Sequence, residues 1–235
     1  MVYRLFSQFL SRSLVRCLLC GDSCMHSSGL CDGCRAELPH LHSACECCAL
    51  PLPPSPSQSG RQCPRCLQHP PAFASARAAW HYAFPIGQLV QRFKYRGDLV
   101  AGHSLARLAA ARLEPMADRP DLLVPIPLHW RKFLFKRGFN QAQLIAAEFG
   151  RQWRIPVAAR LLRKRGAGAS QQTLTRARRL RNLIRSFDVR QPVRGLHIGL
   201  VDDVITTGAT LEAASRALLE AGAWRISTYA LARTP

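Results

Sequence analysis

The sequence predicts an α/β protein, with a parallel sheet flanked by helices and a small cysteine-rich module in front of it. After residue 70, short apolar runs alternate with stretches of helical periodicity, which is typical of parallel strands joined by helices. All ten cysteines lie before residue 67. Near the C-terminus, an apolar run ends in two aspartates and leads through a threonine-rich turn into a helical pattern. We therefore expect a module over residues 1–70 and an α/β domain over residues 71–235.

Length and composition are sufficient for one full domain and one small module. The chain has 235 residues, of which 48% are hydrophobic, enough for a substantial core. Thirty-three Lys and Arg against 14 Asp and Glu give a formal net charge of +19 at pH 7. This charge favours phosphorylated or polyanionic partners, although any generally basic protein would share it. Its distribution is more informative, because residues 160–185 hold nine basic residues and no acidic one.

The first sixteen residues are expected to form a short amphipathic helix that docks on the protein. Apolar side chains recur there near helical spacing: Leu5, Phe6, Phe9 and Leu10. Three arginines interrupt them and no small-residue cleavage site follows, so the segment is a poor signal peptide. No stretch reaches the roughly 18 uncharged apolar residues of a spanning helix. We therefore expect a cytoplasmic protein without a transmembrane segment, and peripheral contact with a membrane stays open.

Eight of the cysteines form four Cys-x-x-Cys pairs: Cys17/Cys20, Cys31/Cys34, Cys45/Cys48 and Cys63/Cys66. In a reducing compartment such pairs bind metal rather than form disulfides. One pair occupies one side of a tetrahedral Zn²⁺ and a second pair closes the site, so four pairs predict two structural zinc ions. Two arrangements stay open: successive pairs can share one zinc ion, or the first pair can share one with the third in a cross-braced arrangement.

The rest of this segment also favours metal. It is rich in Pro, Ser, His and Gly, with a loop expected over residues 51–60, so zinc would supply folding energy that apolar burial does not. Cys24 and Cys47 are left over, and because Cys47 adjoins Cys48 that ligand is uncertain by one position. Four histidines are alternative ligands but are more simply ordinary loop residues: His26, His40, His42 and His69.

The domain is expected to alternate strands and helices. In order these are strand-like stretches over 73–84, a helix capped by Asp98 that runs to about Arg112, a buried strand over 121–127, a helix over 139–153, a strand over 196–201, a helix after Thr210 that stops at Gly222, and a strand over 226–231. Ligands of such folds gather beyond the carboxyl ends of the strands. Asp202 and Asp203 are expected there.

The segment Leu200–Thr210 predicts a site for a ribose 5-phosphate. Gly208 permits close approach of the backbone, and the first amides of the following helix, from Ala209 onward, lack intrahelical partners. With the hydroxyls of three threonines they suit a phosphate dianion: Thr206, Thr207 and Thr210. Asp202 and Asp203 accept hydrogen bonds, so they can hold the vicinal hydroxyls of a sugar or a hydrated Mg²⁺.

Two alternatives compete with this interpretation. A threonine cap alone would be an ordinary helix start, but it would not explain the adjacent acids. A Walker P-loop is excluded because the chain contains no Gly-Lys pair.

The loop after the strand over 121–127 is the second candidate anion site. It is basic and leads into a helix, and Arg131, Arg137 and the backbone of Gly138 are expected to contact a pyrophosphate group. On these residues alone, a solvated basic loop or a nucleic-acid phosphate contact is equally open. Aromatic residues between the basic ones would suit stacking on single-stranded DNA, although such residues are more often part of a core.

Together these motifs resemble the ComF family, with the greatest likeness to its GntX-type members. The resemblance is carried by Phe-Lys-Tyr-Arg-Gly-Asp at 93–98, Pro-Ile-Pro-Leu-His at 125–129, Arg-Gly-Phe-Asn-Gln-Ala at 137–142, Gln171-x-x-Leu174, Arg179-x-x-Asn182 and the loop from Asp202 to Thr210. That loop looks like the phosphoribosyl-diphosphate (PRPP) signature of type I phosphoribosyltransferases. The resemblance implies such a domain behind a double zinc ribbon, and links to natural competence and DNA utilisation. Many relatives have a threonine where this chain has Gly168-Ala169-Ser170.

Two classes of function follow, and whether the protein is an enzyme stays open. As a phosphoribosyltransferase, it would bind the 5-phosphate at Thr206–Thr210, with Asp202 and Asp203 holding the ribose and stabilising charge at the anomeric carbon. Mg²⁺ and basic residues would neutralise the leaving pyrophosphate, and residues 163–181 would form the closing hood. As a binding protein, it would use the pocket as a nucleotide sensor, while the zinc module and the Arg-rich loop bind single-stranded DNA or a DNA-uptake helicase.

Overall fold

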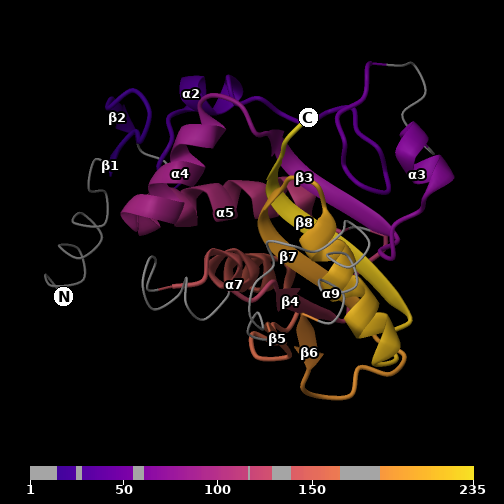
Figure 1. Ribbon diagram of the computed structural model, residues 1–235. Coiled ribbons are helices and arrows are strands. Elements are labelled where there is room, and N and C mark those ends of the chain that lie inside the picture. Colours follow the sequence, from indigo (N-terminus) through magenta and orange to yellow (C-terminus); the bar gives the residue numbers. More distant parts are fainter. Residues whose placement is uncertain (1–14, 25–27, 55–60, 116, 129–138, 165–185) are drawn as a thin grey trace, which may run out of the picture.

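A four-stranded parallel sheet forms the centre of the fold (Figure 1). The computed structural model describes residues 15–24, 28–54, 61–115, 117–128, 139–164 and 186–235. In spatial order the strands are β3 (Ser75–His81), β8 (Arg225–Arg233), β7 (His197–Ile205) and β4 (Leu122–Pro125). Every neighbouring pair in this sheet is parallel. The predicted α/β class is confirmed.

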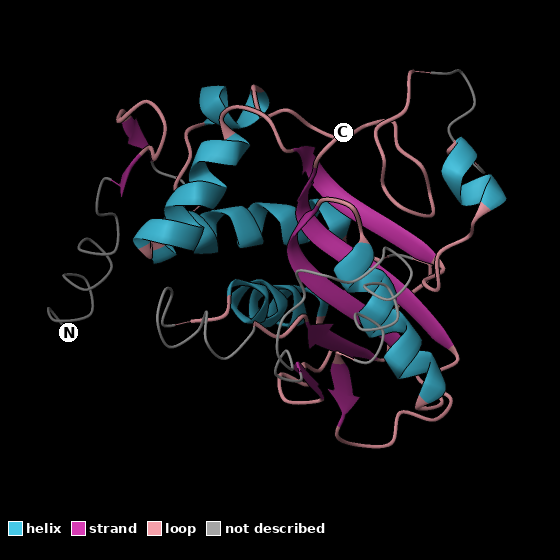
Figure 2. Ribbon diagram, viewed as in Figure 1, coloured by secondary structure: helices cyan, strands magenta, loops and turns pink. Residues whose placement is uncertain are grey.

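Helices cover both faces of the sheet (Figure 2). On one face lie α4 (Ile86–Arg96), α5 (Leu99–Leu113) and α7 (Gln141–Trp153), and on the other lies α9 (Ala209–Glu220). Successive strand residues divide between the two cores as the period of two requires: Val201 packs with the first set of helices and Leu200 with α9. Leu211 and Leu218 of α9 are buried. Each such leucine contributes about 1.5–3 kcal/mol, so its apolar face holds α9 on the sheet.

The helix boundaries follow from their caps. The Ala101 amide donates to Asp98 Oδ1 at 3.0 Å, which confirms the predicted cap of α5. Gly97 ends α4 in the left-handed region, with φ of 66°. Helix α7 begins two residues later than expected because Asn140 caps it by accepting from the Ala142 amide at 3.1 Å.

Strand β7 runs further than the sequence predicted. The expected strand over 196–201 is too short, because β7 continues through Asp202 and Asp203 to Ile205. Pairing with β8 sustains it to the Ile205–Arg233 pair, whereas pairing with β4 ends at Val201. The two aspartates therefore lie within a strand, just past the carboxyl end of its neighbour.

The cysteine-rich segment packs along the outer edge of β3. It contains the short strands β1 (Val15–Arg16) and β2 (Ser23–Cys24), which pair antiparallel, and the helices α2 (Asp32–Ala36) and α3 (Pro64–Gln68). The Leu41 amide donates to the Ala79 carbonyl at 3.2 Å, and the Ala76 amide to the Glu46 carbonyl at 3.1 Å. These bonds satisfy backbone groups that an edge strand would otherwise leave open.

Several expectations lie outside the described residues. These are the amphipathic helix up to residue 14, the anion-site residues Arg131, Arg137 and Gly138, and residues 165–185 of the Arg-rich segment. The described flanks of that segment, β5 (Leu162–Lys164) and β6 (Phe187–Val189), pair antiparallel. Within the described residues, no helix is long and apolar enough to cross a membrane.

Candidate functional site

Seven predicted site residues meet at the carboxyl end of β7. Asp202 and Asp203 are partly buried in the strand, and the threonine loop, residues 206–210, connects the strand to α9. Thr206 and Thr207 are exposed, whereas Gly208, Ala209 and Thr210 are partly buried. The threonine loop and the first residues of α9, whose amides lack intrahelical partners, thus follow the two aspartates at this end of the strand.

Gly208 is required for its conformation rather than for space. It has φ of +75°, in the left-handed region, while a Cβ built there would meet nothing within 4 Å. The chain turns at this residue from the strand direction into α9. The Ala209 amide donates to Thr207 Oγ1 at 3.3 Å, and the Glu212 amide donates to the Gly208 carbonyl at 2.9 Å.

Lys94 is the site residue for which the sequence suggested no role. Its Nζ lies 2.9 Å from Asp203 Oδ1, and the two side chains are 17% and 13% exposed. Lys94 belongs to the Phe-Lys-Tyr-Arg-Gly-Asp string at 93–98, which contributed to the family resemblance without a chemical function. Because α4 and β7 are more than 100 residues apart in sequence, only the packing of α4 on the sheet reveals the contact.

The two aspartates have different electrostatic environments. Asp203 is paired with Lys94. Burial, and then the charge of Asp203, raises the pKa of Asp202 to about 7, against the opposing effects of Lys94 and Lys164. Each carboxylate also accepts from the next backbone amide, Asp202 from Asp203 at 2.8 Å and Asp203 from Val204 at 2.6 Å. The site therefore holds one carboxylate paired with a lysine and a second whose pKa is raised toward neutral pH.

For the second candidate anion site, the structure describes the residues that precede and follow the basic segment. Asn140 Nδ2 donates to the Ile126 carbonyl at 3.0 Å, which ties the start of α7 to the residue that follows β4. Strands β4 and β7 are neighbours. The described residues on both sides of the basic segment therefore lie beside β4, the neighbour of the strand that carries Asp202 and Asp203. Arg131, Arg137 and Gly138 themselves lie outside the described residues.

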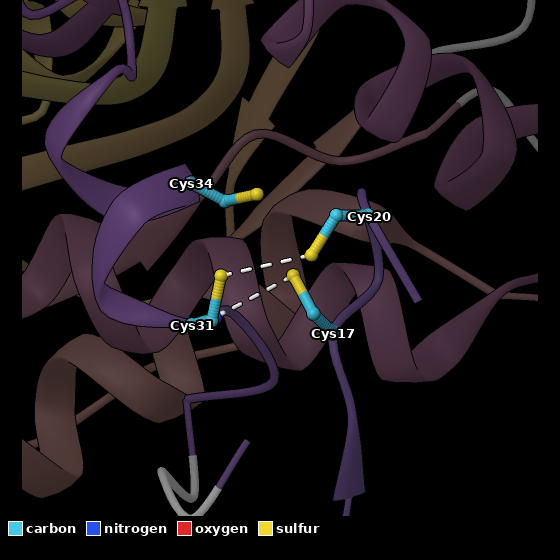
Figure 3. A group of neighbouring side chains, drawn as sticks. All are labelled: Cys17, Cys20, Cys31 and Cys34. Atoms are coloured by element: carbon cyan, nitrogen blue, oxygen red, sulfur yellow. Dashed lines mark hydrogen bonds between the residues drawn. The ribbon is translucent and has the colours of Figure 1, made fainter. Parts of the chain in front are cut away.

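The eight paired cysteines form two groups of four that could hold metal ions. The first cysteine group is Cys17, Cys20, Cys31 and Cys34 (Figure 3), and the second cysteine group is Cys45, Cys48, Cys63 and Cys66. In each group all the sulfur atoms lie within 4.8 Å of one another. Successive pairs are joined, so the cross-braced arrangement is not adopted, and Cys48 rather than Cys47 belongs to the second group. Among the described residues, no histidine joins either group.

The geometry and chemistry of both groups fit Zn²⁺. Zinc–sulfur bonds of about 2.3 Å in a tetrahedron place sulfur atoms about 3.8 Å apart. The Sγ atoms of Cys20 and Cys31 are 3.7 Å apart, as are those of Cys48 and Cys63. The Cys31 amide donates to Cys17 Sγ at 3.4 Å, and the Cys63 amide donates to Cys45 Sγ at 3.3 Å.

The thiol pKa values also fit a bound cation. Burial opposes ionisation of Cys17 and Cys45, but backbone amides lower the pKa of Cys17 to about 6 and of Cys45 to about 7. The Cys31 thiol and burial raise the pKa of Cys34, and burial with the Cys48 thiol raises the pKa of Cys66. Four adjacent thiols cannot all ionise alone, and a divalent cation would remove that repulsion.

Comparisons with known proteins identify a domain family and several relatives of this chain. Residues 103–235 match the family model described as the phosphoribosyl transferase domain. DNA utilization protein YhgH of Salmonella typhimurium is 32% identical over 211 residues, covering 88% of this chain and 91% of that protein. Competence protein F of Haemophilus influenzae is 30% identical over 230 residues, covering 93% and 96%. Among solved structures, adenine phosphoribosyltransferase from Leishmania tarentolae is 14% identical, covers 65% of this chain and 89% of that one, and has a TM-score of 0.38.

Proposed function

Because the chain belongs to the phosphoribosyl transferase domain family, together with the DNA utilization protein YhgH and competence protein F, we propose that it binds PRPP or a related ribose 5-phosphate with Mg²⁺. The observation that carries the proposal is the meeting of Asp202, Asp203 and the threonine loop at one end of β7. The names of these relatives, DNA utilization protein and competence protein, support a proposed role in DNA uptake or utilisation.

The proposed roles follow the chemistry of each group. The hydroxyls of Thr206, Thr207 and Thr210, with the backbone at Gly208 and Ala209, bind the 5-phosphate. Asp202 and Asp203 accept hydrogen bonds from the ribose hydroxyls. Lys94 holds the Asp203 carboxylate in place through their ion pair, and this carboxylate can stabilise positive charge at the anomeric carbon if pentosyl transfer occurs.

The basic segment near β4 and the metal complete the proposed ligand site. Arg131, Arg137 and Gly138 bind the pyrophosphate. Carboxylate oxygens are suitable ligands for Mg²⁺, so Asp202 or Asp203 would hold it together with the ligand. When bound, Mg²⁺ would neutralise charge on the pyrophosphate.

A second candidate function is binding of single-stranded DNA or of a DNA-uptake helicase, with the pocket acting as a nucleotide sensor. The net charge of +19 favours it, together with the names of the relatives. The affinity of the wild-type protein for DNA should then fall steeply as the salt concentration rises. Replacing Arg178, Arg179 and Arg181 together should abolish this binding. Failure to bind DNA even at low salt would eliminate this candidate.

The cysteine-rich segment has a structural role in the proposed function. We infer that each cysteine group holds one Zn²⁺, and that the module ends near residue 70, between the end of α3 and the start of β3. The proposed location of the protein is the cytoplasm, where thiols stay reduced and available to metal.

Isothermal titration with PRPP and Mg²⁺ tests the ligand. Wild-type protein should bind with a stoichiometry of one. Asp203→Asn should bind more weakly, because one of the two carboxylate oxygens that can accept hydrogen bonds from the ribose hydroxyls is replaced. Glu220→Gln is the matched control, since it removes a negative charge from the opposite, exposed end of α9. An absence of binding by wild type, or equal binding by Asp203→Asn and Glu220→Gln, would sink the proposal.

A further inference from the structure

Arg233, at the end of β8, is a buried cation that contacts two functional regions of the chain. Arg233 as a whole residue is 5% exposed to solvent. Within the described residues, its guanidinium donates to backbone carbonyls and to one threonine hydroxyl. In Figure 1 the C-terminus that follows β8 lies beside the cysteine-rich segment. Such a cation is stable in the interior only where fixed acceptors surround it.

The carbonyls that Arg233 contacts belong to the second cysteine group and to the threonine loop. Nε donates to the Cys48 carbonyl at 3.1 Å. Nη1 donates to the Thr206 carbonyl at 2.6 Å and to the Ile205 carbonyl at 3.3 Å. Cys48 is a member of the second cysteine group, and Thr206 is the first residue of the loop. One buried side chain therefore contacts both the candidate metal site and the first residue of the candidate phosphate loop.

The planar guanidinium makes this contact directional. Its donors point along fixed directions, so the Cys48 carbonyl and the Thr206 carbonyl are held relative to each other. A metal bound to Cys45 and Cys48 fixes the turn that carries the Cys48 carbonyl. Without the metal that turn gains freedom, and Arg233 loses one of its fixed acceptors.

We propose that Arg233 is a positioning residue that couples the metal state of the second cysteine group to the threonine loop. Metal in the second group holds the loop in its ordered conformation through Arg233, and metal loss loosens it. Weaker ligand binding after metal loss is a consequence that rests on the proposed function. The coupling itself concerns backbone order and is measurable without any ligand.

The first cysteine group offers a matched control. Arg92 Nη1 donates to the Leu18 carbonyl at 3.2 Å, and Leu18 lies in the turn from Cys17 to Cys20, just as Cys48 lies in the turn from Cys45 to Cys48. Arg92 is on α4 and also pairs with Asp98. It thus anchors a cysteine turn as Arg233 does, but its described contacts do not reach the threonine loop.

Hydrogen exchange followed by mass spectrometry tests the coupling in the full zinc-loaded chain. Two amides report on the loop: Thr234 donates to the Ile205 carbonyl at 3.1 Å, and Glu212 donates to the Gly208 carbonyl at 2.9 Å. In Arg233→Gln these amides should exchange about tenfold faster, on the scale of one charge-assisted hydrogen bond. Arg92→Gln should leave them unchanged. Arg233→Lys should behave as Arg233→Gln, because an ammonium group lacks the planar fork.

The metal arm compares the two groups. Cys66→Ser, which breaks the second group, should accelerate exchange at the same amides, whereas Cys20→Ser, which breaks the first, should not. Zinc content is measured for each variant. If Arg233→Gln accelerates amide exchange and Cys66→Ser does not, Arg233 stabilises the loop independently of the metal, and the proposed coupling is wrong. Equal acceleration by Cys66→Ser and Cys20→Ser would indicate general destabilisation and also overturn it.

Wild-type protein answers the same question if a variant does not fold. A chelator removes zinc in steps, and alkylation identifies which cysteines have been released. Loop exchange that rises with release of the second group, and not with release of the first, supports the proposal; loop exchange unchanged by release of the second group refutes it. If the coupling is observed but this protein does not bind PRPP, the proposed function is contradicted while the role of Arg233 stands.

Discussion

Removal of the Lys94 ammonium group should destabilise both the fold and the site. The perturbation is Lys94→Met, which keeps the length and apolar stem of the side chain. It leaves the Asp203 carboxylate, 13% exposed, beside Asp202 without the ammonium group that pairs with it. Because Lys94 lowers the pKa of Asp202, its loss should raise that pKa further.

The magnitude follows from the burial of the pair. Breaking a fully buried ion pair costs about 3–5 kcal/mol, whereas an exposed pair contributes about 0.2–1 kcal/mol. At 2.9 Å, with side chains 17% and 13% exposed, the Lys94–Asp203 pair lies between these limits, and we expect a coupling energy of about 2 kcal/mol.

A double-mutant cycle isolates that energy. Urea unfolding, followed by the fluorescence of the buried Trp80 and Trp153, is measured for wild type, Lys94→Met, Asp203→Asn and the double variant with zinc present. The double variant should be more stable than the sum of the single changes predicts. The m-value must stay constant for the comparison to hold.

A surface pair provides the reference for this cycle. Arg151 and Glu148 form an i,i+3 pair on α7 in which the arginine is 63% exposed. Its coupling should be about 0.2–0.5 kcal/mol. A Lys94–Asp203 coupling no larger than this reference would refute the expectation that partial burial strengthens this ion pair.

Three further changes test other parts of the structure. Cys48→Ser should lower the zinc content from two ions per chain to one, whereas Cys47→Ser should retain two; equal zinc contents would contradict the assignment of Cys48. Gly208→Ala should lower the free energy of unfolding by about 1 kcal/mol because φ is +75°, while Gly87→Ala in α4 should not destabilise, as urea titration would reveal. Burial lowers the pKa of His197, so the unfolded chain binds its proton more readily. This contribution to stability is present above pH 6.5 and is lost as the pH falls through the lower pKa of the folded state. His197→Gln should therefore reduce the decline in stability between pH 7.5 and pH 5.5; an unaltered slope would indicate that other groups cause it.

Local patterns allowed much of the fold to be predicted. Strand and helix order, the Asp98 cap and the four cysteine pairs depend on residues close together in sequence, so periodicity and spacing were sufficient to find them. The end of β7 was predicted four residues too early, because two adjacent acids are typical of a loop. Their place in the strand depends on pairing with β8, which the local sequence does not encode.

The long-range contacts could not be predicted in the same way. Lys94 is one of 33 basic residues, and nothing in its neighbours indicates that its ammonium group lies against Asp203. Arg233 is two residues from the end of the chain and has no motif around it, yet its guanidinium joins Cys48 to Thr206. Both contacts depend on how distant elements pack.

The sequence alone determined which chemical groups make up the candidate ligand site and the candidate metal sites of this protein. An acidic pair, a threonine loop before a helix and four cysteine pairs are short strings whose chemistry follows from residue type and spacing. Only the tertiary structure decided which cysteine pairs lie together, which carboxylate pairs with a lysine, and how Arg233 joins the second cysteine group to the threonine loop. The reason is physical: a short string constrains its own backbone, whereas charge pairing and burial depend on atoms that folding brings together from distant parts of the chain.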